Sequence, residues 1–379
     1  MKKLIIDAHN ISAGGGFAHL FELLAHIDAV EGGRFDTVEV VVSPQTGKKL
    51  PKFNKIIVRT PAILDSGLKL SRIFWFLFFY TTLFPQRNTV LFSVGGFSFR
   101  RKSTLVLLQN VLPFHLNVRR LYPELTLRLK FSTLKFLYLF SSRFAERILF
   151  PSHIAYNSLI HNYPGLKQKS RVVHHGISRN IFLSAPGCLG NRDKIHKKEV
   201  IKLLYISVFT PYKRQFNLIN YFLISDLDKL GVSLSFVGMI SAEDQKKLDI
   251  VLDNCQGRGV QYLGHLKFTE MREVYEEHDI LVFPSLIESF GIPMVEAAAT
   301  NMWVIFSNPQ FKEIMGINDY QRYSVAESDF CEKIREVIDL HRAGTIDLFD
   351  RHLNTGFRTF EDTARETLMY LEEMLQDSK

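Results

Sequence analysis

Short apolar runs alternate with longer amphipathic segments along the first part of the chain. The apolar runs predict strands, at residues 4–7, 38–42, 55–58, 89–93 and 104–109. Between them lie segments with apolar residues at helical spacing, as in residues 17–27. Strands separated by helices predict a doubly wound parallel sheet, which binds ligands at the carboxyl ends of its strands.

The same alternation starts again at residue 200. Further strands are predicted at 200–207, 234–238, 261–264, 280–283 and 304–307, and helices from 242 and at 271–278, 329–340 and 361–375. Residues 184–199 are rich in Gly, Pro, Asn and Lys, so we expect an interdomain linker there. A chain of 379 residues is also too long for one ordinary core. The sequence therefore predicts an α/β protein with two doubly wound domains, at residues 1–183 and 200–357.

Composition narrows the class of protein. A hydrophobic content of 46% and a charged content of 23% are typical of a globular chain. Cys188, Cys255 and Cys331 lack metal-ligand spacing and predict reduced thiols in a cytosolic protein. Asp7 stands too early for a signal peptide, so export is not expected. The net charge of +8 favours an anionic partner, and nucleic acid has the least support because no zinc-finger, RNP or helix-turn-helix signature is present.

The most informative stretch is residues 279–299. A buried strand leads through Gly291 into a helix expected to begin at Pro293, a position that favours proline. Such a turn presents backbone amides and the positive end of a helix dipole, which together bind phosphate. Glu288 before the turn and Glu296 in the first helical turn would repel phosphate, so each is better suited to hydroxyl groups. A pyrophosphate with a hydroxylated ring at either end is a nucleotide sugar.

The spacing of the two glutamates does not by itself indicate a ligand site. Glu296 is equally well explained as a favourable charge near a helix start, and Glu288 as a solvated loop residue. The full string from Pro284, Pro-Ser-x-x-Glu-Ser-Phe-Gly-Ile-Pro-x-x-Glu-Ala, is more specific. With its Glu-x7-Glu motif, it closely resembles the donor-site signature of the retaining GT-B glycosyltransferases of family 4, which include many bacterial polysaccharide and O-antigen enzymes. The resemblance implies two Rossmann-like domains that face each other across a cleft. The N-terminal domain at 1–183 would bind the acceptor, the C-terminal domain at 200–357 would bind the nucleotide-sugar donor, and a C-terminal helix at 358–379 would pack back toward the first domain.

The resemblance also assigns roles to individual residues. It places Glu288 at the hydroxyls of the transferred sugar and Glu296 at the ribose hydroxyls. The remaining donor contacts that it implies are Met239 and Leu263 beside the base, and Ser289, Phe290, Gly291 and Ile292 at the sugar and phosphates.

Lys213 follows a strand in a loop that opens a helix. This place suits a point charge on a pyrophosphate, although an isolated lysine there is usually a solvated surface charge. Its Pro-x-Lys context resembles that of the family's catalytic-site lysine. Many members also carry an arginine where this chain has Val208. Two explanations stay open: Arg214 supplies the second positive charge, or the arginine is dispensable in this branch.

The N-terminal domain offers a second set of candidates. Gly15 and Gly16, between the first strand and helix, allow backbone to approach a phosphate or sugar, and a plain turn explains them equally. In the family resemblance they match a glycine loop that touches donor phosphate or acceptor. Asn110 matches the acceptor-side loop, but Gln109 stands where a histidine is frequent, so no catalytic histidine is carried over. Nearby histidines such as His115 are expected to be ordinary polar residues.

Residues 69–84 and 128–147 are both apolar and basic. The apolar run at 73–80 is too short to span a bilayer. Four basic residues of the second segment fall within roughly a third of the circumference of a helix: Arg128, Lys135, Arg143 and Arg147. Such a stripe with Phe and Leu beside it suits contact with anionic lipid, whereas core helices with snorkelling basic residues are the alternative. We expect core packing for 73–80 and membrane contact for the second segment.

Together these assignments predict a retaining, metal-independent enzyme without a cofactor. It would move a hexosyl or deoxyhexosyl unit from a nucleotide-diphosphate sugar to a hydroxyl of a glycan or lipid-linked acceptor, in bacterial surface polysaccharide synthesis. We expect it in the cytoplasm, peripheral on the inner face of the plasma membrane. Two other classes stay open: a nucleotide-sugar epimerase or phosphorylase on the same fold, and a non-catalytic glycan- or membrane-binding subunit. Release of nucleotide only when acceptor is present would distinguish a transferase from an epimerase or phosphorylase. Loss of turnover on replacing Glu288 or Lys213 would distinguish it from a non-catalytic subunit.

Overall fold

The structure is a computed structural model, which describes residues 1–12, 14–30, 33–64, 88–98, 103–182, 200–300, 302–316, 323–324, 330–345 and 357–377. The apolar segment at 69–84 and the expected linker at 184–199 lie outside the described residues. The chain divides into two compact units. Unit 1 comprises Met1–Arg119, Pro123–Gly176 and Arg358–Lys379, and unit 2 comprises Arg120–Tyr122 and Ile177–Phe357. The main part of the first unit thus ends at Gly176, before residue 183, where the sequence analysis placed the domain end. The C-terminal segment from Arg358 also belongs to this unit.

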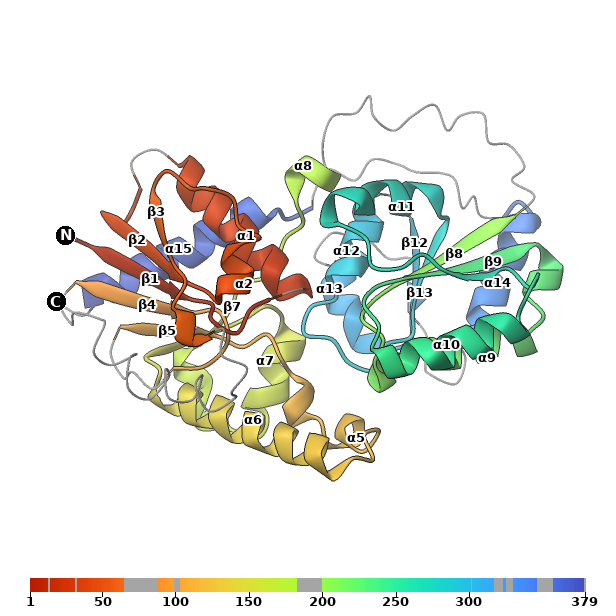
Figure 1. Ribbon diagram of the computed structural model, residues 1–379, viewed down its shortest axis with the longest axis horizontal. Coiled ribbons are helices and arrows are strands. Elements are labelled where there is room, and N and C mark those ends of the chain that lie inside the picture. Colours follow the sequence, from red (N-terminus) through yellow and green to blue (C-terminus); the bar gives the residue numbers. More distant parts are fainter. Residues whose placement is uncertain are drawn as a thin grey trace. The chain divides into compact units, whose positions relative to one another are not determined.

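Within the described residues, unit 1 is built on a seven-stranded parallel sheet with the strand order β3-β2-β1-β4-β5-β6-β7 (Figure 1). The strands are β1 (Lys3–Asp7), β2 (Thr37–Val41), β3 (Ile56–Arg59), β4 (Thr89–Ser93), β5 (Thr104–Leu107), β6 (Arg147–Phe150) and β7 (Ser170–Val172). The helices are α1 (Gly14–Ala29), α2 (Pro44–Gly47), α5 (Leu116–Arg119), α6 (Leu125–Phe144), α7 (His153–Ile160) and α15 (Phe360–Asp377).

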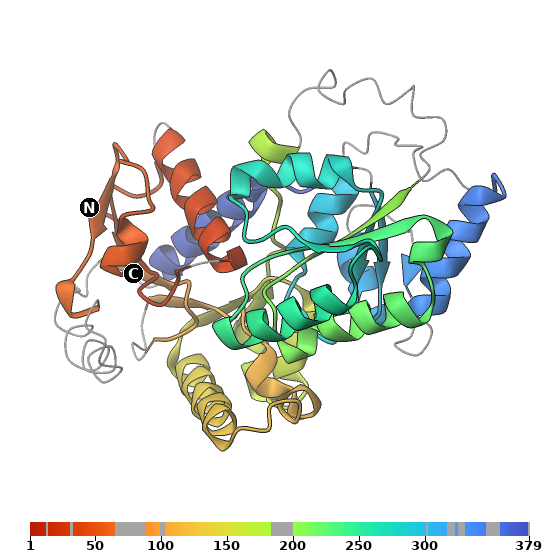
Figure 2. The same cartoon turned by 45° about the vertical axis from the view of Figure 1, so that its right-hand side comes forward.

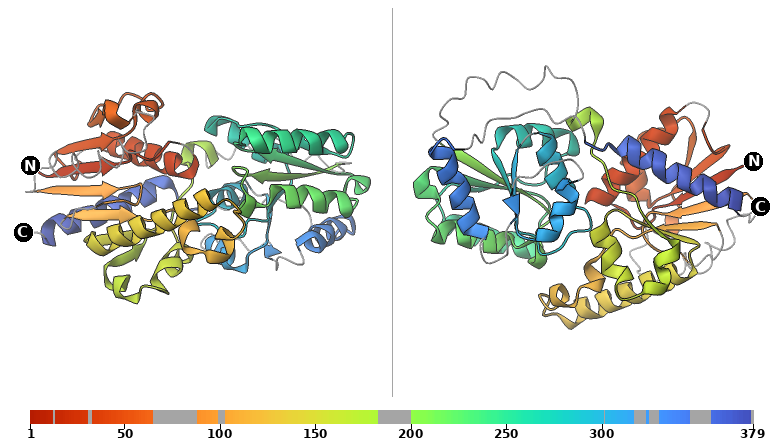
Figure 3. Two further views of the ribbon diagram at one scale, coloured as in Figure 1. Left: turned by 60° about the horizontal axis from the view of Figure 1, so that its bottom comes forward. Right: turned by 180° about the vertical axis from the view of Figure 1, so that it is seen from behind.

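One face of the unit 1 sheet is covered by α1 and α15, which come from opposite ends of the chain and lie side by side (Figure 3). Side chains alternate between the faces of a strand. Leu4 and Ile6 of β1 therefore pack with the apolar faces of these two helices, whereas Ile5 packs in a separate cluster with Leu91. The C-terminal helix thus completes the main core of unit 1.

The chain enters α15 through a close backbone contact. A Cβ atom on Gly176 would lie 2.0 Å from the carbonyl carbon of Thr359, so this approach requires glycine. Arg358 Nε donates to the carbonyl oxygen of His174 at 3.0 Å. These contacts fix the start of α15 at the end of the sheet.

Truncation of Leu371 tests how much α15 contributes to unit 1. This side chain is fully buried between α15 and the sheet, so Leu371→Ala is expected to lower the free energy of unfolding by about 2–5 kcal/mol. Met369 on the same helix is 45% exposed, and Met369→Ala serves as the control with an expected change within about 0.5 kcal/mol. Urea titration followed by circular dichroism measures both. Equal effects of the two substitutions would contradict the packing of α15.

Within the described residues, unit 2 has a six-stranded parallel sheet with the strand order β10-β9-β8-β11-β12-β13. The strands are β8 (Ile201–Ile206), β9 (Val232–Val237), β10 (Val260–Tyr262), β11 (Ile280–Phe283), β12 (Trp303–Phe306) and β13 (Tyr323–Ser324). The helices are α8 (Arg179–Phe182), α9 (Gln215–Ile224), α10 (Ala242–Asn254), α11 (Met271–Glu277), α12 (Ile292–Ala299), α13 (Lys312–Gly316) and α14 (Phe330–Arg342). Helices α9 and α10 cover one face of the sheet, and α11 and α12 cover the other (Figure 2). The predicted pair of doubly wound sheets is confirmed.

The basic helix of unit 1 is shorter than expected at its C-terminal end. Helix α6 ends at Phe144, because Ala145 leaves the helical region with ψ at 143°, and Arg147 opens β6. The placement of Arg147 on the basic helical stripe was therefore wrong. Its guanidinium lies 4.8 Å from the ring centroid of Tyr370 and 3.8 Å from Glu373, both in α15. Arg147 joins a strand to the C-terminal helix.

Candidate active site

The candidate site lies at the carboxyl edge of the unit 2 sheet, where the strand order changes direction (Figure 1). Strand β8 pairs with β9 on one side and β11 on the other. The chain leaves β8 toward Lys213 and leaves β11 toward Glu288. Open α/β sheets bind their ligands at this kind of switch point. The topology therefore brings together two residues that are far apart in the sequence.

Lys213 and Glu288 form a buried ion pair. Lys213 Nζ contacts Glu288 Oε1, and their side chains are only 11% and 12% exposed. The ammonium also lies over the rings of Tyr212 and Phe283, at 5.2 and 5.5 Å from the centroids. Burial by itself lowers the pKa of Lys213, but the charge of Glu288 and the hydrogen bond to it outweigh burial, so the pKa lies above its ordinary value. Lys213 is thus a fixed cation at the switch point.

Backbone contacts hold the two loops together. The Leu286 amide donates to the carbonyl oxygen of Tyr212 at 3.0 Å, and the Tyr205 hydroxyl donates to the carbonyl oxygen of Lys213 at 2.6 Å. Asn308 after β12 donates through Nδ2 to the carbonyl oxygen of Leu286 at 3.0 Å. Neither Tyr205 nor Asn308 was recognised in the sequence, because Tyr205 reads as one more apolar strand residue and Asn308 as a turn residue.

Gly291 makes the turn into α12. It adopts a left-handed conformation with φ at 80°, and a Cβ atom there would lie 2.4 Å from the Met294 side chain. Helix α12 begins at Ile292, one position before the expected Pro293. The first amides of a helix have no intrahelical acceptor and bind anions. Phe290 precedes the turn with its side chain buried, and Ser289 is half-buried.

Glu296 lies deeper than expected. It falls past the first turn of α12, so its placement in the first helical turn was wrong. The side chain is 5% exposed, and its Oε2 accepts a hydrogen bond from the Tyr275 hydroxyl of α11 at 2.7 Å. Burial raises the pKa of Glu296 to about 7, against the smaller lowering by the Tyr275 hydrogen bond. Tyr275 was not recognised in the sequence, where it reads as a helical core residue.

The other expected donor residues follow neighbouring strands of the same sheet. Met239 comes after β9 and Leu263 after β10, and both are half-buried. Val208, which stands where the family frequently has an arginine, is 41% exposed after β8. Arg214 adopts a left-handed conformation with φ at 62° at the start of α9. The role of Arg214 as a second positive charge stays a prediction.

In unit 1 the expected glycine loop is part of a helix. Helix α1 begins at Gly14, so Gly15 and Gly16 form its first turn. A Cβ atom on Gly16 would lie 3.4 Å from Gln109 Oε1, which places the end of β5 close to the start of α1. Asn110 is exposed, and its Oδ1 accepts from the Leu112 amide at 3.1 Å, as in an Asx turn. Asn110 as an acceptor residue stays a prediction.

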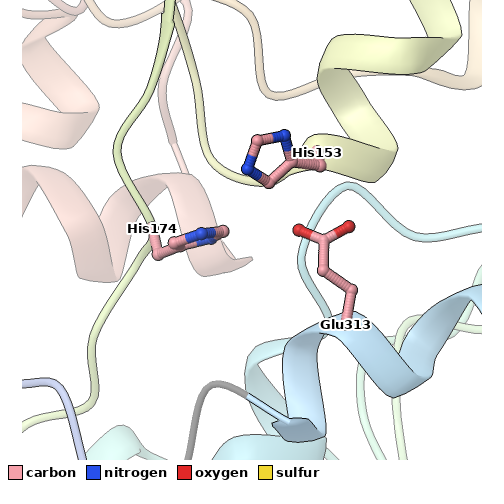
Figure 4. A group of neighbouring side chains, drawn as sticks. All are labelled: His153, His174 and Glu313. Carbon is pink, nitrogen blue, oxygen red and sulfur yellow. The ribbon is translucent and has the colours of Figure 1, made fainter.

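Two histidine side chains of unit 1 lie close together. The rings of His153 and His174 in unit 1 have centroids 5.8 Å apart (Figure 4). Two imidazoles are fewer than the three protein ligands of a typical zinc site, so we assign no metal to this pair. His115 Nε2 lies 2.8 Å from Ser158 Oγ, and burial lowers the pKa of His115. His115 is thus a hydrogen-bonded structural residue.

The chain is similar in sequence to known proteins. Residues 191–343 match the model of the family described as glycosyl transferases group 1. The O-antigen chain mannosyltransferase RfbU of Salmonella typhimurium is 24% identical over 292 residues, which are 74% of this chain and 76% of RfbU. An uncharacterized 41.2 kDa protein of the cps region of Klebsiella pneumoniae is 26% identical over 176 residues, 46% of each chain.

Solved structures share the fold. The crystal structure of HepE from Anabaena in complex with UDP-glucose has a TM-score of 0.65 at 15% identity, over 100% of this chain and 99% of HepE. The structure of WaaG, a glycosyltransferase involved in lipopolysaccharide biosynthesis, has a TM-score of 0.64 at 13% identity, over 99% of this chain and 98% of WaaG. At these identities the likeness shows the fold alone. The family match over residues 191–343, the curated relative and the shared fold together support a glycosyltransferase of the GT-B fold.

Proposed function

We propose that the protein is a retaining glycosyltransferase, which moves a hexosyl or deoxyhexosyl unit from a nucleotide-diphosphate sugar to a hydroxyl of a glycan or lipid-linked acceptor. The observation that carries this proposal is the buried pair of Lys213 and Glu288 at the switch point of unit 2, close to the Gly291 turn into α12. A fixed cation and helix amides suit a pyrophosphate, and the carboxylates suit hydroxyl groups. The UDP-glucose complex of HepE supports a nucleotide sugar as the donor.

The chemistry follows from the charges. Without donor, Lys213 is paired with Glu288. We expect the diphosphate of the donor to attract Lys213 away from this pair. Glu288 is then free to accept hydrogen bonds from the sugar hydroxyls. As the sugar leaves, negative charge builds on the departing phosphate, where Lys213 and the amides of Gly291 and Ile292 stabilise it. These groups supply the positive charge that a metal supplies in other transferases. In this proposal Glu296 accepts hydrogen bonds from the ribose hydroxyls.

We propose that the transfer retains the configuration of the anomeric carbon without a covalent sugar intermediate on a carboxylate. A double-displacement mechanism needs an acid and a nucleophile that flank the scissile bond. Glu296 is held by Tyr275 inside unit 2 and is assigned to the ribose, so it does not serve as the second carboxylate. We propose that the departing phosphate oxygen accepts the proton of the acceptor hydroxyl on the same face of the sugar. The new bond then forms on the side that the nucleotide leaves.

A donor panel tests this proposal. The purified protein is heated with different nucleotide sugars, and the donor is expected to raise the melting temperature because it binds the folded state alone. Nucleoside diphosphate release is then measured with and without glycan acceptors. Release that depends on acceptor supports transfer. No stabilisation by any nucleotide sugar, or release that needs no acceptor, would overturn it.

We propose that the acceptor belongs to surface polysaccharide synthesis, such as that of O-antigen or lipopolysaccharide. The curated relative RfbU is an O-antigen chain mannosyltransferase, and WaaG is involved in lipopolysaccharide biosynthesis, and both support this assignment. We propose that this acceptor is lipid-linked, in which case the enzyme works in the cytoplasm at the inner face of the plasma membrane.

The exposed face of α6 supports contact with that membrane. Leu125, Leu129 and Phe136 are 70%, 59% and 64% exposed, and they fall within about 40° on the helix circumference. Arg128 and Arg143 are exposed on the same helix, and Lys135 is half-buried. None of the described helices is long and apolar enough to cross a bilayer. We propose that these apolar side chains enter the lipid interface while the basic residues meet anionic headgroups.

Vesicle binding tests this role of α6. The double substitution Leu129→Glu and Phe136→Glu removes apolar contact and adds repulsion, so we expect affinity for anionic phospholipid vesicles to fall more than about tenfold. Ile250 on α10 of unit 2 is 63% exposed, and Ile250→Glu is the matched control. Flotation with vesicles measures binding, and melting temperatures confirm folding. Unchanged binding of the double variant would exclude α6 as the membrane contact.

A further inference from the structure

A buried tyrosine connects α11 to helix α12 of the candidate site. Tyr275 is fully buried, and its hydroxyl donates to Glu296 Oε2 at 2.7 Å. The same hydroxyl lies 3.4 Å from the carbonyl oxygen of Pro293, in the first turn of α12. Burial and the neighbouring charge of Glu296 raise the pKa of Tyr275 well above its ordinary value. The hydroxyl therefore keeps its proton at neutral pH and acts as a hydrogen-bond donor.

This bond uses one oxygen of the Glu296 carboxyl group. Within the described residues the side chain accepts through Oε2, and 5% of the residue stays exposed. A carboxylate has two acceptor oxygens, so Oε1 can accept from a ligand while Oε2 stays bound to Tyr275. The bond also lowers the pKa of Glu296, because it favours the charged form. Tyr275 thus affects both the orientation and the charge of this carboxyl group.

Phe182 packs against the ring of Tyr275. It lies in α8, close to Ile177, where the chain enters unit 2, and it is 5% exposed. The two rings meet edge to face, with centroids 5.6 Å apart and an interplanar angle of 73°. Phe182 also contacts Phe268, before α11, with ring centroids 6.4 Å apart. Edge-to-face contacts are a favoured arrangement of aromatic rings, so Phe182 restricts the position of the Tyr275 ring.

Helix α11 is anchored at its C-terminal end. His278 follows the helix directly, with Nδ1 2.7 Å from the carbonyl oxygen of Val274 and Nε2 2.9 Å from Ser235 Oγ of β9. Burial lowers the pKa of His278, so the ring is neutral at pH 7. A carbonyl oxygen only accepts, so Nδ1 donates to Val274 and Nε2 accepts from Ser235. These bonds tie α11 to the sheet and make it a fixed support for the Tyr275 hydroxyl.

We propose that Tyr275 and Phe182 are positioning residues for the donor. Tyr275 orients the Glu296 carboxyl group toward the ribose hydroxyls, and Phe182 keeps the Tyr275 ring in place. This inference rests on the proposed function, which assigns Glu296 to the ribose. It adds two residues that no sequence motif indicated, and both act through Glu296 without touching the donor.

Carbon-13 NMR of the side-chain carboxyl groups tests the contact in the free protein. The full chain is labelled at the carboxyl carbon of glutamate, and the signal that is missing from Glu296→Gln belongs to Glu296. Tyr275→Phe removes a bond to the charged form, so the midpoint of this signal is expected to rise by about half a pH unit or more. Tyr221→Phe, at a half-buried position of α9, is the matched control and should leave the midpoint unchanged. An unchanged midpoint in Tyr275→Phe would overturn the proposal.

Kinetics test the role in donor binding. With the donor that the panel selects, Tyr275→Phe is expected to raise KM about fivefold or more at pH 7 and to leave kcat within about twofold, because ribose contacts act equally in the ground and transition states. The rise in KM should be smaller at pH 9, where Glu296 is largely charged in both proteins. A purely structural effect would raise KM equally at both pH values, and that result would contradict the positioning role.

Phe182→Leu tests the second residue. It leaves the Tyr275 hydroxyl in place but removes the edge-to-face contact, so we expect smaller changes of KM and of the NMR midpoint in the same direction. Phe222→Leu replaces an equally buried phenylalanine of α9 and is the matched control. All variants are assayed below their melting temperatures. If Phe182→Leu behaves like Phe222→Leu, Phe182 has no positioning role.

The outcomes separate this inference from the proposed function. A donor panel without any stabilising nucleotide sugar overturns the proposed function, and the donor role of Tyr275 and Phe182 with it. If a donor binds and KM of Tyr275→Phe at pH 7 stays at the wild-type value, the positioning role alone is overturned. A raised NMR midpoint together with a pH-dependent rise in KM supports both.

Discussion

Replacing Lys213 by alanine is expected to lower acceptor-dependent nucleotide release by about a hundred- to a thousandfold. In the proposed mechanism Lys213 is a fixed cation beside the leaving phosphate, and it would act in the transition state, where charge develops. The measurement is the turnover rate with the donor selected by the panel. Turnover that stays within about tenfold of wild type in the folded variant would contradict the assignment of Lys213.

Loss of the cation also affects folding, and a second variant separates the two effects. Lys213→Ala leaves Glu288 buried without its partner, which costs on the order of 3–5 kcal/mol of stability. Adding Glu288→Gln removes that charge, so the double variant is expected to recover most of the stability and none of the turnover. Lys246→Ala on α10 removes an exposed lysine of the same unit and is the control. Recovery of turnover in the double variant would show that folding alone was affected.

The second large effect concerns Glu296, where Glu296→Gln is expected to stabilise the free protein at pH 8. Burial raises the pKa of Glu296 from 4.5 to about 7 in the folded state. Between these values the folded state holds a proton that the unfolded chain has released, so stability falls as the pH rises through this window. The loss is on the order of 3 kcal/mol. Glutamine cannot ionise and avoids this loss, while its side-chain oxygen can still accept from Tyr275.

Urea titrations at pH 5 and pH 8 measure the effect. The variant should exceed wild type at pH 8 and approach it at pH 5. Glu273→Gln, at an exposed position of α11, should change neither value. Equal stability of wild type and Glu296→Gln at pH 8 would contradict the burial of a raised-pKa carboxyl group at this position.

Donor binding should show the opposite dependence on pH. In the proposed complex Glu296 accepts from the ribose hydroxyls, and a charged carboxylate accepts more strongly than a neutral carboxyl group. The affinity of wild type for the proposed donor is therefore expected to rise as the pH passes through about 7. Glu296→Gln should bind the donor more weakly and without this step. Calorimetry across the pH range measures both. Under this proposal the same buried carboxyl group would weaken the free fold and strengthen the donor complex.

The sequence by itself determined the two sheets of this protein and the glycine turn between β11 and α12. Alternating apolar runs and helical segments fixed the two parallel sheets, because period and turn residues are local properties of the chain. The string from Pro284 to Ala297 located the turn at Gly291, which only glycine occupies without strain at a φ of 80°. The ends of helices are not set by periodicity alone. The helical pattern of residues 128–147 therefore included Arg147, which lies in β6.

Only the tertiary structure decided what the side chains of the site contact. Lys213 meets Glu288, and Tyr275 holds Glu296, because strands and helices distant in sequence become neighbours in the unit 2 sheet. No local pattern carries such a pairing. Burial and partner choice depend on the whole fold, and they set the charges and free hydrogen-bonding atoms from which function is inferred.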